Sequence, residues 1–346
     1  MPLDACYSLD QTLRLLSIPS PTGYPRQVCG ALVETLEGLG FSPRQLRKGG
    51  VVCPLGGEGR PLALAAHVDT LGLMVRAVKP DGRLAFTCLG GPSLQAVETE
   101  NVTVITRGGQ RYTGVVELRN ASKHVNRELD SEKRDDTTLE ILLDEEVSSR
   151  EDVERLGIAV GDIVCLDPRA RVTESGFIRS RFLDDKLSAG MLLTLARGVA
   201  EGTVRLSRKV TLFFSVYEEV GHGASCGLPE DTEDLLVVDM GCVGEGLSCR
   251  EQQVSICAKD SSGPYDYEMT GELIALAKSN GIDYAVDVYP AYGSDAAAAL
   301  RAGRDVRFAL IGAGVYASHG YERSHLAGAE NTLRLLEAYL EQSTYA

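Results

Sequence analysis

The sequence predicts an α/β fold, in which a mixed sheet is flanked by helices and interrupted by an inserted small antiparallel β-barrel-like domain. Strand and helix patterns alternate at both ends of the chain, which is typical of a sheet with helices on its faces. Between about residues 75 and 166 the pattern changes to short strands separated by turns. The chain has 346 residues, more than a single core of about 250–300 residues accommodates. We therefore expect a main domain from residues 1–74 and 167–346, and an inserted β domain from residues 75–166.

The N-terminal part predicts two helices followed by a buried strand. Residues 9–16 show helical spacing of apolar side chains, and a segment containing Pro and Gly ends this pattern. Residues 26–40 form a second amphipathic stretch, which closes with a glycine suited to a helix C-cap. Residues 61–66, PLALAA, are a short apolar run of the kind found in buried parallel strands.

The inserted segment is predicted to be antiparallel. Its short strands include RLAFTCL, NVTVITR and YTGVVEL, and the turn signals KPDG and RGGQ separate strands of this kind. Residues 123–146 are crowded with charge, which indicates a solvated loop rather than a site. A serine pair before Asp152 predicts the start of a short helix that ends near Gly157, ahead of a last strand, VGDIVCL.

Regular alternation resumes after about residue 178 and predicts parallel strand pairing, because helices lie between the strands. The expected elements are a helix at 187–200, strands at 209–217 and 234–240, a helix at 271–281, a strand at 305–312 and a final helix at 330–341.

Charge and cysteine usage narrow the class of protein. Acidic residues outnumber basic ones by 49 to 35, and the net charge of -14 repels phosphate backbones and anionic headgroups. We therefore expect neither nucleic acid nor a membrane as partner. No stretch approaches the ~18 apolar residues of a membrane span, and the N-terminal region lacks the pattern of a secretion signal, so a cytoplasmic location is expected. The nine cysteines are scattered without C-x-x-C spacing, which predicts reduced structural thiols.

Imidazoles and carboxylates follow the predicted strands, and in open α/β sheets ligands bind beyond the carboxyl ends of the strands. The strand at 61–66 is followed directly by His67 and Asp69. Three later strands are followed by further residues of the same kinds, namely Glu218, Glu219, Asp239 and His319. Asp184 and Asp185 precede the helix at 187–200, at its positive end.

Taken singly, each of these residues has an ordinary structural explanation. Asp185 suits a helix N-cap, a lone Asp after a strand often forms a turn, and a lone His is often simply hydrogen-bonded. Gathered at one edge of a sheet, however, at least four carboxylates and two imidazoles would need cations to offset their repulsion. Such ligands without thiolates favour zinc, with cobalt or manganese as alternatives. A carboxylate bridging two ions about 3.5–4 Å apart would account for the whole set, so we expect two divalent ions per subunit.

The adjacent pair Glu218 and Glu219 indicates a division of roles. Consecutive residues on a regular strand point to opposite faces, so both cannot face one site from within a strand. The strand is therefore expected to end near Tyr217, with Val220 and Gly221 in the following turn. One glutamate can then bind metal while its neighbour acts as a general base.

These residues resemble the M42 family of dinuclear metallo-aminopeptidases, which includes glutamyl and tetrahedral aminopeptidases. The resemblance covers nearly the whole chain, including the inserted β domain. It is carried by the motifs AAHVDTLGLMV (65–75), FLDDKLSAG (182–190), SVYEEVGHGA (215–224), VVDMG (237–241), YGSDAAAA (292–299) and ASHGYE (317–322).

The resemblance implies a zinc-aminopeptidase-like catalytic domain and a role for each polar residue. It makes Asp184 the bridging metal ligand and Glu218 the catalytic base, with Asp69 orienting a metal-bound imidazole. The terminal metal ligands it implies are His67, Glu219, Asp239 and His319. The implied activity is removal of N-terminal residues from peptides. The inserted domain would build homo-oligomers, from dimers up to dodecamers, and control access to the site.

The chain departs from the family pattern at three places. Lys186 stands where relatives usually have an arginine, so a point charge replaces a planar fork. The loop that contains His222 is one residue shorter than usual, and HGYE replaces the commoner His-Ser-Pro run. His325 competes with His319 for the ligand role, and we favour His319 because it follows the strand more closely. His124, in the charged segment, is expected at the surface.

The residues leave two other classes of function open. A metal-dependent deacylase or carboxypeptidase-like amidohydrolase would keep the metals but would not need a free amine on its substrate. A catalytically silent assembly scaffold would lack a ligand or the base, and neither is missing. A glycosidase is discounted, because such enzymes usually have aromatic platforms for the sugar and the chain contains no Trp.

Overall fold

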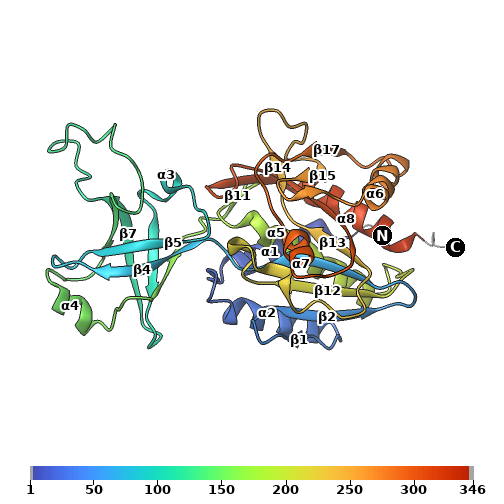
Figure 1. Ribbon diagram of the computed structural model, residues 1–346, viewed down its shortest axis with the longest axis horizontal. Helices are drawn as coiled ribbons and strands as arrows, with labels where there is room; N and C mark the ends of the chain where they lie inside the picture. Colours follow the sequence, from blue (N-terminus) through green and yellow to red (C-terminus); the bar gives the residue numbers. More distant parts are fainter. Residues whose placement is uncertain (1–2, 343–346) are drawn as a thin grey trace. The chain divides into compact units, whose positions relative to one another are not determined.

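The computed structural model describes residues 3–342, which form two compact units. One unit contains the described residues up to Asp69 and from Arg169 onward, and the other is Thr70–Pro168. The first unit is a mixed sheet flanked by helices, and the second is a closed antiparallel barrel (Figure 1). The predicted fold class is therefore confirmed.

Six α-helices and two 3₁₀ turns belong to the main unit. The sequence positions their ends: the Asp4 side chain accepts hydrogen bonds from the first turn of α1, and Asp266 does the same for α6. Gly40, just past α2, has a φ of +89°, the left-handed conformation that a helix end favours in glycine. The elements are α1 (Ala5–Leu16), α2 (Arg26–Gly38), α5 (Leu183–Ala200), η1 (Glu218–Val220), η2 (Gly223–Ser225), α6 (Tyr267–Ser279), α7 (Asp295–Arg301) and α8 (Leu326–Glu341).

A sheet of 13 strands forms the centre of this unit. Its strands are β1 (Arg44–Gln45), β2 (Val51–Gly56), β3 (Leu62–His67), β10 (Arg171–Val172), β11 (Phe177–Ser180), β12 (Val210–Ser215), β13 (Asp234–Val238), β14 (Gly241–Val243), β15 (Val254–Asp260), β16 (Gly263–Pro264), β17 (Tyr284–Val288), β18 (Arg307–Tyr316) and β19 (Glu322–His325). Four neighbours, β12, β3, β13 and β18, are parallel to one another in that order. Their carboxyl ends therefore meet at one edge.

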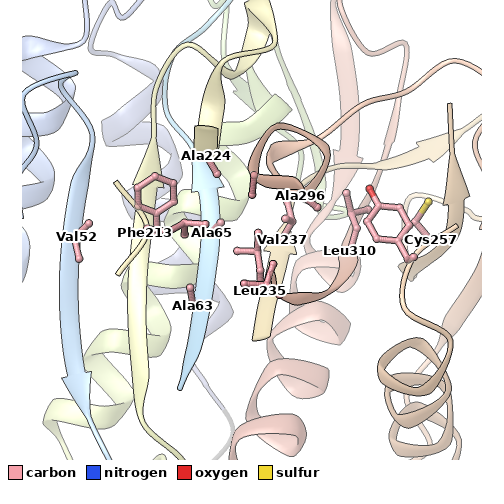
Figure 2. Packing of buried hydrophobic residues seen from close by; sticks show 14 of the residues in the cluster. Val52, Ala63, Ala65, Phe213, Ala224, Leu235, Val237, Cys257, Ala296 and Leu310 are labelled. Carbon is pink, nitrogen blue, oxygen red and sulfur yellow. The ribbon is translucent and has the colours of Figure 1, made fainter. Parts of the chain in front are cut away.

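The core of the main unit lies on both sides of these strands. On one side, Phe213 of β12, Ala65 of β3 and Val237 of β13 belong to a buried cluster that includes Ala296 and Ala299 of α7 (Figure 2). Helices α5 and α8 pack against β3 and β18. All six residues of β3 are buried, as expected for a strand with covered faces, so the end of β3 is held rigidly.

The second unit is a barrel in which β4, β5, β8, β7, β6 and β9 are neighbours in that order. Its strand pairs are antiparallel, and the short turns predicted from the sequence join β4 to β5 and β6 to β7 as hairpins. Its elements are β4 (Gly72–Val78), β5 (Leu84–Leu89), α3 (Leu94–Val97), β6 (Asn101–Ile105), β7 (Arg111–Leu118), β8 (Leu139–Leu143), α4 (Arg150–Arg155) and β9 (Ile163–Leu166).

Several local expectations were met and others were wrong. Ser149 caps α4 by accepting a hydrogen bond from the Asp152 N–H. The charged segment 123–146 is not all loop, because β8 lies within it and pairs with β5 and β7. The elements that were not predicted also include strands β1, β2, β4, β10, β11, β14 to β17 and β19, and helices α3 and α7. All nine cysteines are free thiols. Within the described residues, no helix has the length and apolar character needed to cross a membrane.

Candidate metal centre

The parallel strands deliver the predicted polar residues to one edge of the main sheet. His67 is the last residue of β3, and Asp239 directly follows β13. His319 lies in the loop after β18, and Glu218 and Glu219 lie in η1 after β12. The prediction that β12 ends before the glutamate pair is confirmed, since its last residue is Ser215. Four chain segments thus meet because their strands are neighbours with a common direction.

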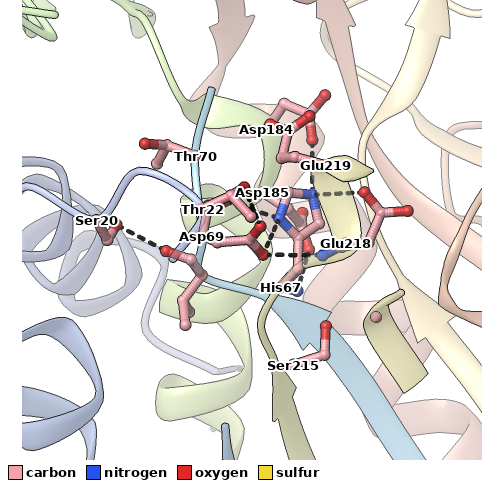
Figure 3. A network of polar contacts seen from close by, with 12 residues as sticks. Ser20, Thr22, His67, Asp69, Thr70, Asp184, Asp185, Ser215, Glu218 and Glu219 are labelled. Carbon is pink, nitrogen blue, oxygen red and sulfur yellow. Dashed lines mark hydrogen bonds and ion pairs between the residues drawn. The ribbon is translucent and has the colours of Figure 1, made fainter. Parts of the chain in front are cut away.

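Asp184 lies at the centre of this group and comes from a fifth segment, the start of α5. Its Oδ1 is 3.0 Å from His67 Nε2, and its Oδ2 is 3.7 Å from His319 Nε2. The Glu219 Oε2 is also 3.7 Å from His319 Nε2. Figure 3 shows Asp184 and Glu219 on one side of the His67 ring. One carboxylate therefore contacts both imidazoles, the position that a bridging ligand requires.

The side chains fit divalent metal ions. Ligand atoms of His67, Asp184 and Glu219 lie within 4.8 Å of one another, and so do those of His67, Asp185 and Asp239. Glu219 Oε1 and Asp185 Oδ1 are buried and have no hydrogen-bond partner among residues 3–342. Buried carboxylate oxygens are normally satisfied, so these two atoms point to cations as their partners. The donors are oxygens and imidazole nitrogens, which suit zinc, cobalt or manganese.

Electrostatics of the protein groups alone are unfavourable in this cluster. Burial, together with the charge of Asp184, raises the pKa of Asp239 to about 7. Burial also raises the pKa values of Glu218 and Glu219 well above their usual range, and neighbouring carboxylates add to the effect. Burial opposes charge on His67, but its hydrogen bond with Asp184 and the surrounding carboxylates raise its pKa well above the usual value. The cluster therefore attracts positive charge.

Asp69 contacts two members of the cluster, His67 and Glu218. Its main-chain oxygen is 3.0 Å from His67 Nδ1, and its carboxylate Oδ1 is 3.7 Å from the same nitrogen. The Glu218 N–H donates to Asp69 Oδ1, and the Thr22 hydroxyl donates to Oδ2 at 2.6 Å (Figure 3). Asp69 is fully buried, so these bonds fix its position. It thereby orients both the His67 ring and the start of the turn that carries Glu218.

The two glutamates of η1 face different partners. Glu218 Oε2 is 3.8 Å from His67 Nε2, whereas Glu219 Oε2 is near His319. Both line a pocket of about 580 Å³ together with Asp184, Asp239 and His319. Other residues that line the pocket are Met240, Tyr292, Ser294 and Arg301. A pocket of this volume has room for a bound molecule beside the cluster.

Asp185 and Lys186 have roles that the sequence only partly indicated. Asp185 lies at the start of α5, where an N-cap was expected, but its carboxylate is buried in the cluster and Oδ2 accepts the His67 N–H. Lys186 is buried and points away from the cluster, donating to the main-chain oxygens of Leu15 and Ile18. The point charge thus binds the end of α1 to α5.

The remaining histidines lie elsewhere. His325 caps α8, accepting the Ala327 N–H through Nδ1, and its Nε2 is 2.8 Å from the Ser175 main-chain oxygen. It does not join the cluster, and His319 does. His222 and His124 are exposed, and neither lines the 580 Å³ pocket.

Sequence reasoning missed two buried carboxylates next to the cluster. Asp295, at the start of α7, accepts the Ser215 hydroxyl at 2.6 Å and the Ala224 N–H at 2.7 Å, so it connects β12 to η2. Glu322 accepts main-chain N–H groups at the far side of the cluster. Both belong to motifs noted in the sequence, YGSD and HGYE, but their partners are distant in the chain.

Comparison with known proteins assigns the class. The family described as M42 glutamyl aminopeptidase matches residues 49–335. The chain therefore belongs to the M42 peptidase family, and it is classed with the family's aminopeptidases as a peptide hydrolase.

Individual relatives agree with this assignment. The chain is 42% identical over 329 residues to YhfE of Bacillus subtilis (strain 168), an aminopeptidase by name, covering 94% of this chain and 95% of the relative. It is 27% identical over 210 residues to the lysyl aminopeptidase of Pyrococcus furiosus, covering 60% of this chain and 58% of that one. Among solved structures, the fold matches the TET aminopeptidase of a marine sediment archaeon, Thaumarchaeota archaeon SCGC AB-539-E09, with a TM-score of 0.87 at 20% identity and 97% coverage of each chain. It matches the Pyrococcus horikoshii TET1 peptidase with a TM-score of 0.84 at 21% identity, covering 96% of this chain and 99% of that chain.

Proposed function

We propose that this protein is a metal-dependent aminopeptidase that uses two divalent ions, with zinc favoured, to remove N-terminal residues from peptides. The proposed bridging ligand is Asp184. The proposed terminal ligands are His67, Glu219, Asp239 and His319. This assignment is supported by the contacts of Asp184 with both imidazoles and by the buried, unpartnered oxygen of Glu219.

The ions would supply Lewis acidity to a water molecule and to the scissile carbonyl. Glu218 would accept the proton of the attacking water on its carboxylate and deliver it to the nitrogen of the leaving peptide. Asp69 would hold His67 in the tautomer that leaves Nε2 free to bind metal, since its main-chain oxygen and carboxylate face Nδ1. The pocket beside the cluster would receive the N-terminal residue of the substrate.

One observation carries this proposal furthest. Of two adjacent glutamates, Glu219 faces His319, while Glu218 faces His67 and its main-chain N–H donates to Asp69 Oδ1. A protein that only binds metal would need only Glu219, the glutamate near His319. A second carboxylate, partly exposed to the pocket and with a pKa raised by desolvation, beside the proposed ligands but not central to them, is what a general base requires.

The test compares a free peptide with its N-acetylated form and uses a variant that lacks the base. We expect hydrolysis of leucyl or glutamyl peptides only when the amine is free, since the aminopeptidase reaction needs that amine. Glu218→Gln is expected to lower kcat by at least about 100-fold while bound metal, measured by elemental analysis, stays at the wild-type level. Preferred cleavage of acetylated substrates would favour the deacylase class. Full activity of Glu218→Gln would exclude Glu218 as base.

We also propose that the chain forms homo-oligomers. The Pyrococcus horikoshii TET1 peptidase can assemble into a tetrahedron or a large octahedral shell, and this chain matches nearly its full length. Light scattering coupled to size-exclusion chromatography would give the subunit number, and a monomer at micromolar concentration would contradict the proposal.

A further inference from the structure

A carboxylate outside the proposed ligand set joins two of the ligand-bearing segments. Glu322 is the first residue of β19 and is 2% exposed. Strand β19 pairs with β11, where Glu322 lies opposite Ser180, and it also pairs with β18. β11 leads directly into α5, which carries Asp184, and β18 leads into the loop that carries His319. Glu322 therefore lies next to both of these segments.

The two oxygens of Glu322 each hold one of these segments. Oε2 accepts the main-chain N–H of Asp184 at 3.1 Å, and Oε1 accepts the main-chain N–H of His319 at 3.1 Å. The side chains of Asp184 and His319 approach each other to 3.7 Å on the cluster side of this carboxylate. One rigid group thus fixes the backbone spacing of two residues that come from distant parts of the chain.

Burying Glu322 beside the cluster carries a free-energy cost. A further buried carboxylate beside Asp184 adds negative charge where several carboxylates already repel one another. His319 also has a φ of +64°, a left-handed conformation that non-glycine residues rarely adopt, so its backbone must be held by contacts. Hydrogen bonds from the main-chain N–H groups of Asp184 and His319 offset part of the cost of burying Glu322 and hold His319 in place.

We propose that Glu322 is a positioning residue, which sets the distance between Asp184 and His319 and thereby the affinity of the site for divalent metal. This inference depends on the proposed metal-binding function of the two residues. Glutamine at this position would keep the size of the side chain but would have only one accepting oxygen. Its amide NH₂ would face one of the two N–H donors, so one segment would lose its anchor.

The experiment measures zinc affinity rather than turnover alone. Metal-free wild-type protein, Glu322→Gln and Glu251→Gln would each compete for zinc with a chromophoric chelator. Glu251 is the matched control, because it is a largely buried glutamate in the same unit and its carboxylate pairs with the neighbouring Arg323. Thermal unfolding of each metal-free protein, and kcat at saturating zinc, complete the measurements.

We expect Glu322→Gln to weaken zinc binding by about 10- to 100-fold, whereas Glu251→Gln binds zinc as the wild type does. Excess zinc should restore most of kcat, and the substitution should destabilise the metal-free protein by less than it weakens zinc binding, because only one buried hydrogen bond is lost. Wild-type affinity in this variant, or a loss matched by an equal loss of metal-free stability, would overturn the inference. If wild-type protein binds no zinc, cobalt or manganese, the proposed metal centre fails and the inference fails with it.

A second variant covers the case in which Glu322→Gln does not fold. Glu322→Asp keeps both accepting oxygens but withdraws them by one methylene group. It is expected to fold and to bind zinc at least about threefold more weakly than the wild type, with recovery at excess metal. Unchanged affinity in a folded Glu322→Asp protein would contradict the positioning role.

Discussion

In the metal-free protein, the free energy of unfolding should fall as the pH rises. The size of this fall can be worked out from the pKa of Asp239. The pKa of this buried carboxyl is raised from 3.8 to about 7 by burial and by the charge of Asp184. Because the folded-state pKa lies above the unfolded value, the folded metal-free protein holds an extra proton between these two values. Its free energy of unfolding therefore decreases as the pH rises from about 4 through about 7. Metal binding should remove this penalty, because a cation then faces the ionised carboxylate.

A shift of about 3 pKa units corresponds to about 4 kcal/mol once the pH is well above 7, and about 2–3 kcal/mol of it is lost between pH 5 and pH 8. The raised pKa values of Glu218 and Glu219 act in the same direction. Asp239→Asn carries no charge to desolvate, so it should flatten the pH dependence of the metal-free protein and stabilise it at pH 8. The same substitution should reduce the gain in stability on adding zinc.

Urea unfolding of chelator-treated protein at pH 5, 6, 7 and 8, followed by circular dichroism, would measure these differences. Glu245→Gln is the control, because Glu245 is exposed and should leave the pH dependence unchanged. The reasoning would be refuted if the metal-free wild type were equally stable at pH 5 and pH 8, or if Asp239→Asn lowered its stability at pH 8.

Three further substitutions test the supporting structure. Lys186→Met should lower the free energy of unfolding in urea by about 1–3 kcal/mol, since main-chain oxygens near the end of α1 lose their donor, and kcat should stay close to wild type. Gly312→Ala would place a methyl group 1.7 Å from the main-chain oxygen of Asp239, so the soluble yield should fall sharply. Gly271→Ala is the control and should be tolerated, because no atom lies within 4 Å of the added methyl group. Equal yields of the two variants would contradict this packing argument. Thr22→Val removes the hydrogen bond to Asp69 and should reduce kcat while changing the unfolding temperature only slightly. An unchanged kcat would show that this bond does not support the site.

Local sequence patterns predicted the elements that carry their own signal. The apolar run at 61–66 is β3, and the amphipathic stretch at 26–40 contains α2. The pair Glu218 and Glu219 was placed after its strand because a strand cannot direct neighbours to the same face. The strand-end rule also brought His67, Asp239 and His319 together, since it depends only on strand direction and chain order.

The missed elements are those whose stability comes from distant partners. α7 has only seven residues, too few for an isolated helix, and it is held by burial against the main sheet. β8 lies inside a charged segment and is fixed by pairing with β5 and β7. β19 has four residues and exists because β11 and β18 offer it hydrogen bonds. No local periodicity indicates such partners.

The sequence by itself determined which residue types follow each strand, and with them the chemistry that the sheet edge can support. Only the tertiary structure decided the distances and the supporting contacts. It placed His319 rather than His325 in the cluster, directed Lys186 away from it, and placed Glu322 between the segments that carry Asp184 and His319. The physical reason is that residue type and strand order are local properties of the chain, whereas hydrogen-bond partners across the sheet depend on how all of its segments pack together.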